Sequence, residues 1–204
     1  MSIFDPLYRQ KNVSGQIART LFSIGQAIKH MLWEKGKVEQ LTPAQIQVLL
    51  YLKYTRSDVA TVNAVARYLA CTPATVSGIL DVLQSKGLVI RTKKMDDRRK
   101  VLLKLTPKGE RAVTLVQDVG YEIEELVSEL SPEEQELLES LLVKITQRLV
   151  EKGMIVPSDI CANCCFFRQD KQPGNKPHYC EFLNIFLSEG EIYKECPDFR
   201  TSYN

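Results

Sequence analysis

The sequence predicts a mainly α-helical protein, a winged helix-turn-helix with long helices, joined to a small, irregular, cysteine-rich module. Three observations support this fold class. Apolar residues recur at helical spacing over most of residues 1–152. A basic hairpin interrupts that pattern between residues 88 and 105, and five of the six cysteines lie in the last 44 residues.

The helices are expected from apolar spacing and from their capping signals. The first runs from Tyr8 to Trp33, with apolar residues every three or four positions. Thr42-Pro43 and Thr72-Pro73 each place a capping residue before a proline at the first helical position. They predict helices over 44–54 and from 72 to Gly87, with a short helix over 61–70 between them. Two helices joined by a tight connection indicate a helix-turn-helix.

A two-stranded wing and two further helices follow. Residues 88–92 and 101–105 have the composition of strands, and the highly polar stretch 93–100 connects them. Further helices are expected over 106–129 and 131–152, the second opened by a capping box at Ser131. Gly153 and Pro157 then close the helical region. The expected domains are therefore a winged-helix domain over 1–152 and a cysteine-rich module over 153–204.

Charge is distributed unevenly along the chain. The net charge is only +2, yet residues 86–111 contain ten Lys or Arg against three acids, whereas residues 118–139 contain nine acids and no Lys or Arg. Nucleic acid, if bound, should meet the basic block. No export signal and no membrane-length apolar run is visible, so a reducing, cytoplasmic location is expected. No catalytic constellation or phosphate-binding glycine loop suggests an enzyme.

The helix after Thr72 and the wing suit the two grooves of duplex DNA. A helix fits the major groove, and arginines on a hairpin can enter the minor groove. Hydroxyls and a methyl on the first helical turn can contact phosphates or base edges. The candidate DNA-contacting residues are Thr72, Ala74, Thr75 and Ser77 on the helix, with Lys93, Lys94, Arg98 and Arg99 on the wing.

Residues 42–111 resemble the winged-helix core of MarR-family regulators. The resemblance rests on six motifs, at residues 41–45, 65–69, 75–77, 83–89, 97–99 and 105–109, and with the flanking helices it extends over about residues 8–152. It implies an obligate homodimer, in which the first and last helices interlock, on a pseudo-palindromic double-stranded operator. It also implies that Asp97 orients the wing while Arg98 or Arg99 enters the minor groove. Gly78 stands where many members carry a long polar or basic side chain.

The cysteines near the end of the chain are candidate ligands of a metal site. Cys161 and Cys164 form a C-x2-C pair, whereas Cys180 and Cys196 occur singly, which is a poor zinc-ribbon pattern. An iron-sulfur cube accepts ligands from scattered loops. Eight aromatic residues share this segment and could shield a cluster from water. A 4Fe-4S cluster is therefore favoured, and zinc or thiol-disulfide sensing are the alternatives.

Residues 161–199 also resemble the high-potential iron-sulfur proteins. The shared features are the C-x2-C pair with Phe166 beyond it, Cys180 followed by Phe182, and Cys196 followed by Phe199. The resemblance implies that Cys161, Cys164, Cys180 and Cys196 hold a 4Fe-4S cluster in an aromatic pocket. Lys194-Glu195 replaces the Gly-aromatic step that precedes the last cysteine in that family. Cys165 is interpreted as a spectator, Cys71 as a packed residue, and His178 as a residue outside the ligand set.

Together the two halves predict a DNA-binding transcriptional regulator whose operator affinity responds to a 4Fe-4S cluster. Gain or loss of the cluster should order or melt the tail, and the last helix would carry that change to the dimer. The alternative is a MarR-type regulator that binds a small aromatic effector and carries a structural zinc site in its tail.

Overall fold

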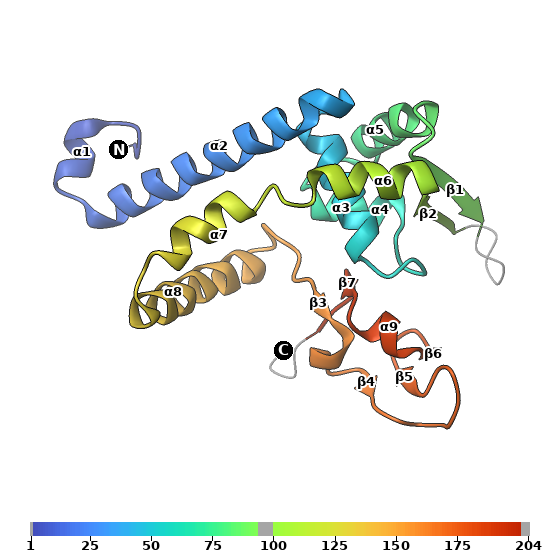
Figure 1. Cartoon of the computed structure of the whole chain (residues 1–204). Coiled ribbons are helices and arrows are strands. Elements are labelled where there is room, and N and C mark those ends of the chain that lie inside the picture. Colours follow the sequence, from blue (N-terminus) through green and yellow to red (C-terminus); the bar gives the residue numbers. More distant parts are fainter. Residues whose placement is uncertain (1, 94–99, 201–204) are drawn as a thin grey trace.

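The computed structural model describes residues 2–93 and 100–200. The winged-helix body lies at the right of the view, long helices extend from it to the left, and the tail lies below it (Figure 1). The predicted mainly helical winged helix-turn-helix is confirmed. Over the described residues, none of the helices is both long and apolar enough to cross a membrane.

The first predicted helix is two helices. α1 spans Pro6–Gln10 and α2 spans Val13–Glu39. The break arises because Asn12 adopts an extended backbone and its side chain accepts a hydrogen bond from Gly15 N, which caps α2. α2 then continues six residues beyond the predicted end at Trp33 (39 against 33) and stops at Gln40, whose φ of 53° is left-handed.

The helix-turn-helix forms where the capping signals predicted it. α3 spans Pro43–Tyr54 and begins with a capping box between Thr42 and Gln45. α4 spans Val62–Tyr68, and α5 spans Pro73–Ser85. Each of these two helices begins at a threonine whose side chain accepts a backbone N–H three residues later. Helical spacing predicts a buried stripe of Val76, Ile79, Leu80 and Leu83 on α5. Three of these residues are buried, and Ile79 is half-buried.

The wing and the last helices follow in order. β1 (Val89–Lys93) pairs antiparallel with β2 (Val101–Leu105), and the tip that joins them lies outside the described residues. α6 spans Pro107–Val116, α7 spans Tyr121–Ser128 and α8 spans Pro132–Glu151. The prediction of a single helix over 106–129 was wrong, because turns at 117–120 separate α6 from α7. Lys35 on α2 holds Asp118 in this turn at 2.6 Å, and Gly120 is a poor helix former.

One apolar core joins α2 through α6 and the wing strands. Its fully buried members come from several elements, and they include Ile46, Val48, Leu49, Val65, Val76, Leu80, Leu83 and Val113. This core fixes α5 and β1 relative to each other, because both contribute side chains to it.

The tail contains short strands, which the sequence did not predict. β3 (Asp159–Ile160) pairs with β7 (Glu195–Cys196). β4 (Phe167–Arg168), β5 (His178–Cys180) and β6 (Ile185–Leu187) form a second small sheet, and α9 spans Glu189–Ile192. Strands of two or three residues have too few positions to show an alternating pattern, so they were expected as irregular chain.

The long helices carry apolar side chains that the single chain leaves exposed. On α2 these include Ile17, Ile24 and Ile28, and on α8 they include Leu137, Leu141 and Ile145. Only Leu32 of the predicted stripe on α2 is fully buried within the chain, where it joins the core. Exposed apolar faces of this extent are typical of interfaces.

Gly36→Ala tests the close packing at the end of α2. A Cβ there would lie 2.2 Å from the carbonyl oxygen of Leu41. Because that atom belongs to the backbone, the chain must shift, and we expect the free energy of unfolding to fall by about 2 to 3 kcal/mol. Gly78→Ala in α5 is the matched control, since a Cβ there meets nothing within 4 Å. It should raise the free energy of unfolding by about 0.5 to 1 kcal/mol. Urea denaturation at one protein concentration measures both, and equal changes would contradict the packing argument.

Candidate functional site

The N-terminal half of α5 presents a polar face to solvent. Thr72, Ala74 and Thr75 are exposed, and Ser77 is half-buried. The hydroxyl of Thr72 accepts the N–H of Thr75 at 3.1 Å and lies 2.9 Å from the Thr75 hydroxyl. Thr72 is therefore occupied as the helix cap, while the exposed side chain of Thr75 can reach an outside partner. Gly78 is exposed on the same helix and has open space around it.

Arg91 fastens the wing to α5. Its guanidinium lies 2.7 Å from the Asp81 carboxylate and donates to the side-chain oxygen of Gln84 at 2.5 Å. It also donates to the carbonyl of Ser77 at 3.3 Å. These contacts set the angle between the helix and β1. The sequence did not reveal this role of Arg91, because the residue looks like one more basic side chain of the wing.

The wing candidates are only partly described. Lys93 is exposed at the end of β1. Lys94, Arg98 and Arg99, together with Asp97, lie outside the described residues, so their predicted contacts with DNA remain predictions. The strands that carry the wing are in register from Val89 opposite Leu105 to Lys93 opposite Val101.

The four predicted ligand cysteines line one pocket in the tail. Cys161, Cys164, Cys180 and Cys196 share it with Phe166, Phe167, Phe182, Leu183 and Leu187. Of the eight aromatic residues expected as a wall, these three phenylalanines contribute to the lining. Tyr193 is exposed, and Tyr203 lies outside the described residues. The cavity holds about 10 Å³, which is room for roughly one water molecule.

The two small sheets bring the cysteines together. Pairing of β3 with β7 places Asp159 opposite Cys196, so Cys161 arrives beside Cys196. Pairing of β4 with β5 places Phe167 opposite Cys180. A tight turn joins the two halves, since Cys164 N donates to the Cys161 carbonyl at 2.9 Å. Four cysteines that lie up to 35 positions apart (161 to 196) thereby reach one pocket.

Cys161 and Cys196 form a buried pair with unequal proton affinities. A hydrogen bond from Cys196, together with the Arg56 guanidinium, lowers the pKa of Cys161 to about 6 although burial opposes this. The same hydrogen bond, together with burial, raises the pKa of Cys196. Cys161 is therefore the thiolate of the pair, and thiolate is the form that binds metal.

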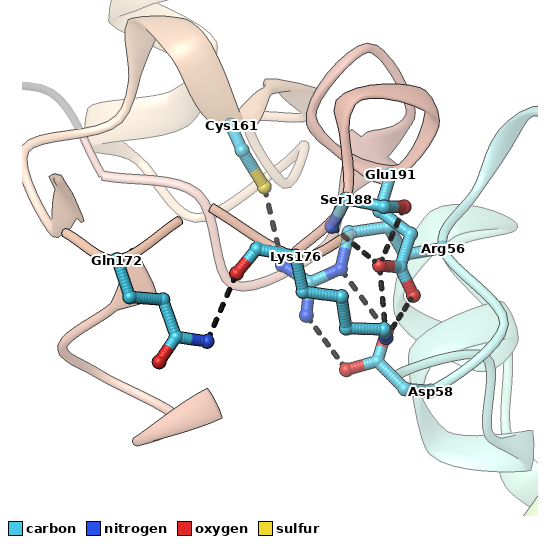
Figure 2. Close-up of polar contacts among 7 residues, drawn as sticks. All are labelled: Arg56, Asp58, Cys161, Gln172, Lys176, Ser188 and Glu191. Carbon is cyan, nitrogen blue, oxygen red and sulfur yellow. Dashed lines mark hydrogen bonds and ion pairs between the residues drawn. The ribbon is translucent and has the colours of Figure 1, made fainter. Parts of the chain in front are cut away.

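Arg56 lines the same pocket, although it belongs to the winged-helix domain and not to the tail. It lies between α3 and α4 and is 1% exposed. Nη1 donates to Cys161 Sγ at 3.1 Å, while Nε and Nη2 donate to the Asp58 carboxylate at 3.0 and 2.6 Å (Figure 2). Sequence reasoning missed Arg56, because an arginine in the polar stretch Thr55–Asp58 reads as part of a solvated loop.

Side chains outside the pocket hold the tail in shape. Lys176 on the long loop pairs with Glu191 of α9 at 3.1 Å, and Glu191 accepts the N–H of Ser188 at 2.8 Å (Figure 2). His178 is buried with Nε2 3.0 Å from a carboxylate oxygen of Glu189. Among the described residues, neither His178 nor Cys165 is part of the pocket lining. The backbone N–H of Cys165 donates to the carbonyl of Arg200 at 2.9 Å.

Comparison with known proteins identifies the winged-helix part. The sequence profile of the MarR family matches residues 39–100. The uncharacterized HTH-type transcriptional regulator YsmB of Bacillus subtilis is 30% identical over 138 residues, which cover 67% of this chain and 92% of that protein. The chain belongs to the MarR family.

Further relatives agree with this MarR-family assignment. The HTH-type transcriptional regulator FarR of Neisseria gonorrhoeae is 37% identical over 76 residues, which cover 35% of this chain and half of FarR. MepR in the S. aureus MepR–DNA complex is 31% identical to this chain, with a TM-score of 0.58. The match covers 65% of this chain and 97% of the MepR chain. The family profile ends 61 residues before Cys161 (100 against 161), so the four cysteines of the pocket in this MarR-family protein lie outside it, whereas Arg56 lies within it.

Proposed function

We propose that this MarR-family protein is a DNA-binding transcriptional regulator whose operator affinity responds to a 4Fe-4S cluster held in the tail. The observation that carries the proposal is the pocket lined by Cys161, Cys164, Cys180 and Cys196. Four cysteine thiolates are the ligand set that such a cluster requires.

The chemistry of the other residues around the pocket supports the same group. Phe166, Phe167 and Phe182 supply apolar walls, which lower access of water to a bound cluster. The guanidinium of Arg56 offsets negative charge on the thiolates. When bound, a cluster supplies a redox-active and oxygen-sensitive group. The chain's own part is to hold it through the four sulfurs, exclude water with the phenylalanines and donate a hydrogen bond from Arg56 to Cys161.

Zinc is the alternative group for this pocket. Structural zinc sites are commonly built from two closely spaced ligand pairs, whereas here Cys161 and Cys164 form one such pair and Cys180 and Cys196 occur singly. An iron-sulfur cube binds each thiolate through a different iron and accepts ligands from separate loops. The spacing of the four cysteines along the chain therefore favours the cluster.

DNA binding and dimerisation are supported by the winged-helix part. α5 presents Ala74, Thr75 and Ser77 next to a wing that Arg91 fixes in place. MepR, which resembles this chain, has been solved with DNA bound. The apolar faces of α2 and α8 are left exposed by the single chain, and a second copy would cover them. A two-fold dimer of this kind would read a pseudo-palindromic duplex.

Anaerobic purification with iron and sulfide analysis tests the proposed function. We expect about four iron and four sulfide per chain and a broad visible absorption band. A duplex selected from a random-sequence pool serves as the DNA probe. Its affinity for the cluster-loaded and metal-free proteins should differ by about fivefold or more.

Two outcomes would replace this proposal. Stoichiometric zinc in a colourless protein supports the alternative. In that case the protein is a MarR-type regulator that responds to a small aromatic effector, and the zinc site in its tail is structural. A protein that binds iron but has equal DNA affinity with and without the cluster would show that the cluster does not regulate DNA binding.

A further inference from the structure

Arg56 is shared between the winged-helix domain and the tail. Its guanidinium is buried, with two nitrogens on Asp58 and the third on Cys161 Sγ (Figure 2). A guanidinium carries its donors in one rigid plane, so the positions of Asp58 and Cys161 are linked through it. Asp58 belongs to the segment that leads into α4, and Cys161 belongs to the pocket.

The burial of Arg56 makes its partners important. A buried charge is tolerated only when it is paired and its donors are satisfied. Asp58 neutralises the charge, at 2.6 Å from Nη2. The acceptor for Nη1 is the sulfur of Cys161, at 3.1 Å. Any change that moves this sulfur away from Nη1 weakens or breaks a buried hydrogen bond.

The segment that follows Arg56 reaches one strand of the wing and the first helix of the helix-turn-helix. Leu103 N on β2 donates to the carbonyl of Ala60 at 2.8 Å, and Thr61 bridges to Leu102 of the same strand. Thr61 also caps α4, because its side chain accepts the N–H of Ala64 at 3.2 Å. Within five residues of Arg56 (56 to 61), the chain is therefore bonded to the wing and to the first helix of the helix-turn-helix.

The tail also docks on this segment through its backbone. Arg56 N donates to the carbonyl of Glu195 at 3.1 Å, and Thr55 forms a parallel bridge with Glu195. Glu195 directly precedes Cys196, so a second pocket residue is tied to the same point. Arg67 on α4 and Asp198 form a more exposed ion pair at 3.2 Å.

We propose that Arg56 is a positioning residue that couples the cysteine pocket to the wing strand β2 and to α4, the first helix of the helix-turn-helix. Its hydrogen bond to Cys161 holds the segment 56–61, and through it β2 and α4, in one arrangement. The pocket has little spare volume, so a change in its contents displaces the lining, and Arg56 transmits that displacement. The coupling is a property of metal-free protein as well, and it rests on the proposed function only for the identity of the bound group.

A double-mutant cycle in the metal-free chain of 204 residues tests the coupling. The proteins are the unsubstituted chain, Arg56→Lys, Cys161→Ser and the double variant, because Lys keeps the charge near Asp58 but lacks the planar fork. We expect Cys161→Ser to change affinity for the selected duplex by about fivefold or more when Arg56 is present, and by less than about twofold in the Arg56→Lys background. Hydrogen exchange at residues 59–68 and 101–105 should show the same dependence.

Arg67→Lys provides the matched control. Arg67 also joins the winged helix to the tail, through Asp198 at the edge of the pocket, yet half of its side chain is exposed and its ion pair is with a carboxylate and not with a cysteine sulfur. Its effect should add to that of Cys161→Ser. Additive effects for Arg56→Lys as well would overturn the proposal and leave Arg56 a purely structural residue.

Measurements on cluster-loaded protein separate this proposal from the proposed function. Arg56→Lys should retain iron but lower the reduction potential, because a hydrogen bond to a ligand sulfur favours the reduced cluster. The ratio of DNA affinities with and without cluster should fall to within about twofold. If the unsubstituted protein binds no iron while the cycle still shows coupling, the cluster is refuted and the role of Arg56 stands. Iron binding with an additive cycle refutes Arg56 alone.

Discussion

Cys164→Ser is expected to abolish cluster binding, whereas Cys165→Ser leaves it intact. The two residues are neighbours, and both are half-buried, but only Cys164 contributes to the pocket lining among the described residues. Serine is close in size to cysteine and a much poorer ligand for iron, so the substitution removes a ligand with little change in packing. Loss of one ligand of four should reduce iron from about four per chain to less than about one after anaerobic reconstitution.

Further cysteine variants sharpen this comparison. Cys180→Ser should lose iron as Cys164→Ser does, although it lies 16 residues away (180 against 164) on β5. Cys71→Ser, in the helix-turn-helix connection, should retain it. Far-ultraviolet circular dichroism of each metal-free variant shows whether the fold survives. Equal iron loss in Cys164→Ser and Cys165→Ser would contradict the four-ligand assignment.

Gly78→Glu is expected to weaken DNA binding by about 30- to 100-fold, which is about 2 to 3 kcal/mol, because a carboxylate is forced against phosphates. Gly78 lies on the exposed face of α5 that carries Ala74 and Thr75. A Cβ at this position meets nothing within 4 Å, so the new side chain extends outward without disturbing the fold. The loss therefore reports on charge at the DNA surface.

Gly78→Gln is the matched control for charge. It has nearly the same size and shape as Gly78→Glu, and its affinity for the selected duplex should stay within about threefold of the unsubstituted protein, because no charge is added. Fluorescence anisotropy over a range of salt concentrations measures both variants, and affinity should fall steeply with salt. Equal loss for Glu and Gln would show that size at Gly78, and not charge, limits binding.

The elements that the sequence predicted well are those that depend on neighbouring residues. A threonine before a proline caps a helix through its own side chain and the N–H three residues later, so Thr42, Thr72 and Thr106 marked helix starts. The buried stripe of α5 followed from helical periodicity. The breaks at Asn12 and Gly120 were missed, because apolar spacing continues across both and hides a change of direction.

The sequence by itself determined the MarR-like winged helix and its basic wing, and it indicated which four of the six cysteines are candidate ligands. These conclusions depend on local patterns and on the chemistry of each residue type. Only the tertiary structure decided how the cysteines meet, because the pairing of β3 with β7 and of β4 with β5 joins distant segments through backbone bonds. The same holds for Arg56, since its burial against Cys161 depends on how the tail docks. The cysteine pocket thus contacts the winged-helix domain through the hydrogen bond between Arg56 and Cys161. These two residues are 105 positions apart, so no local pattern encodes their contact.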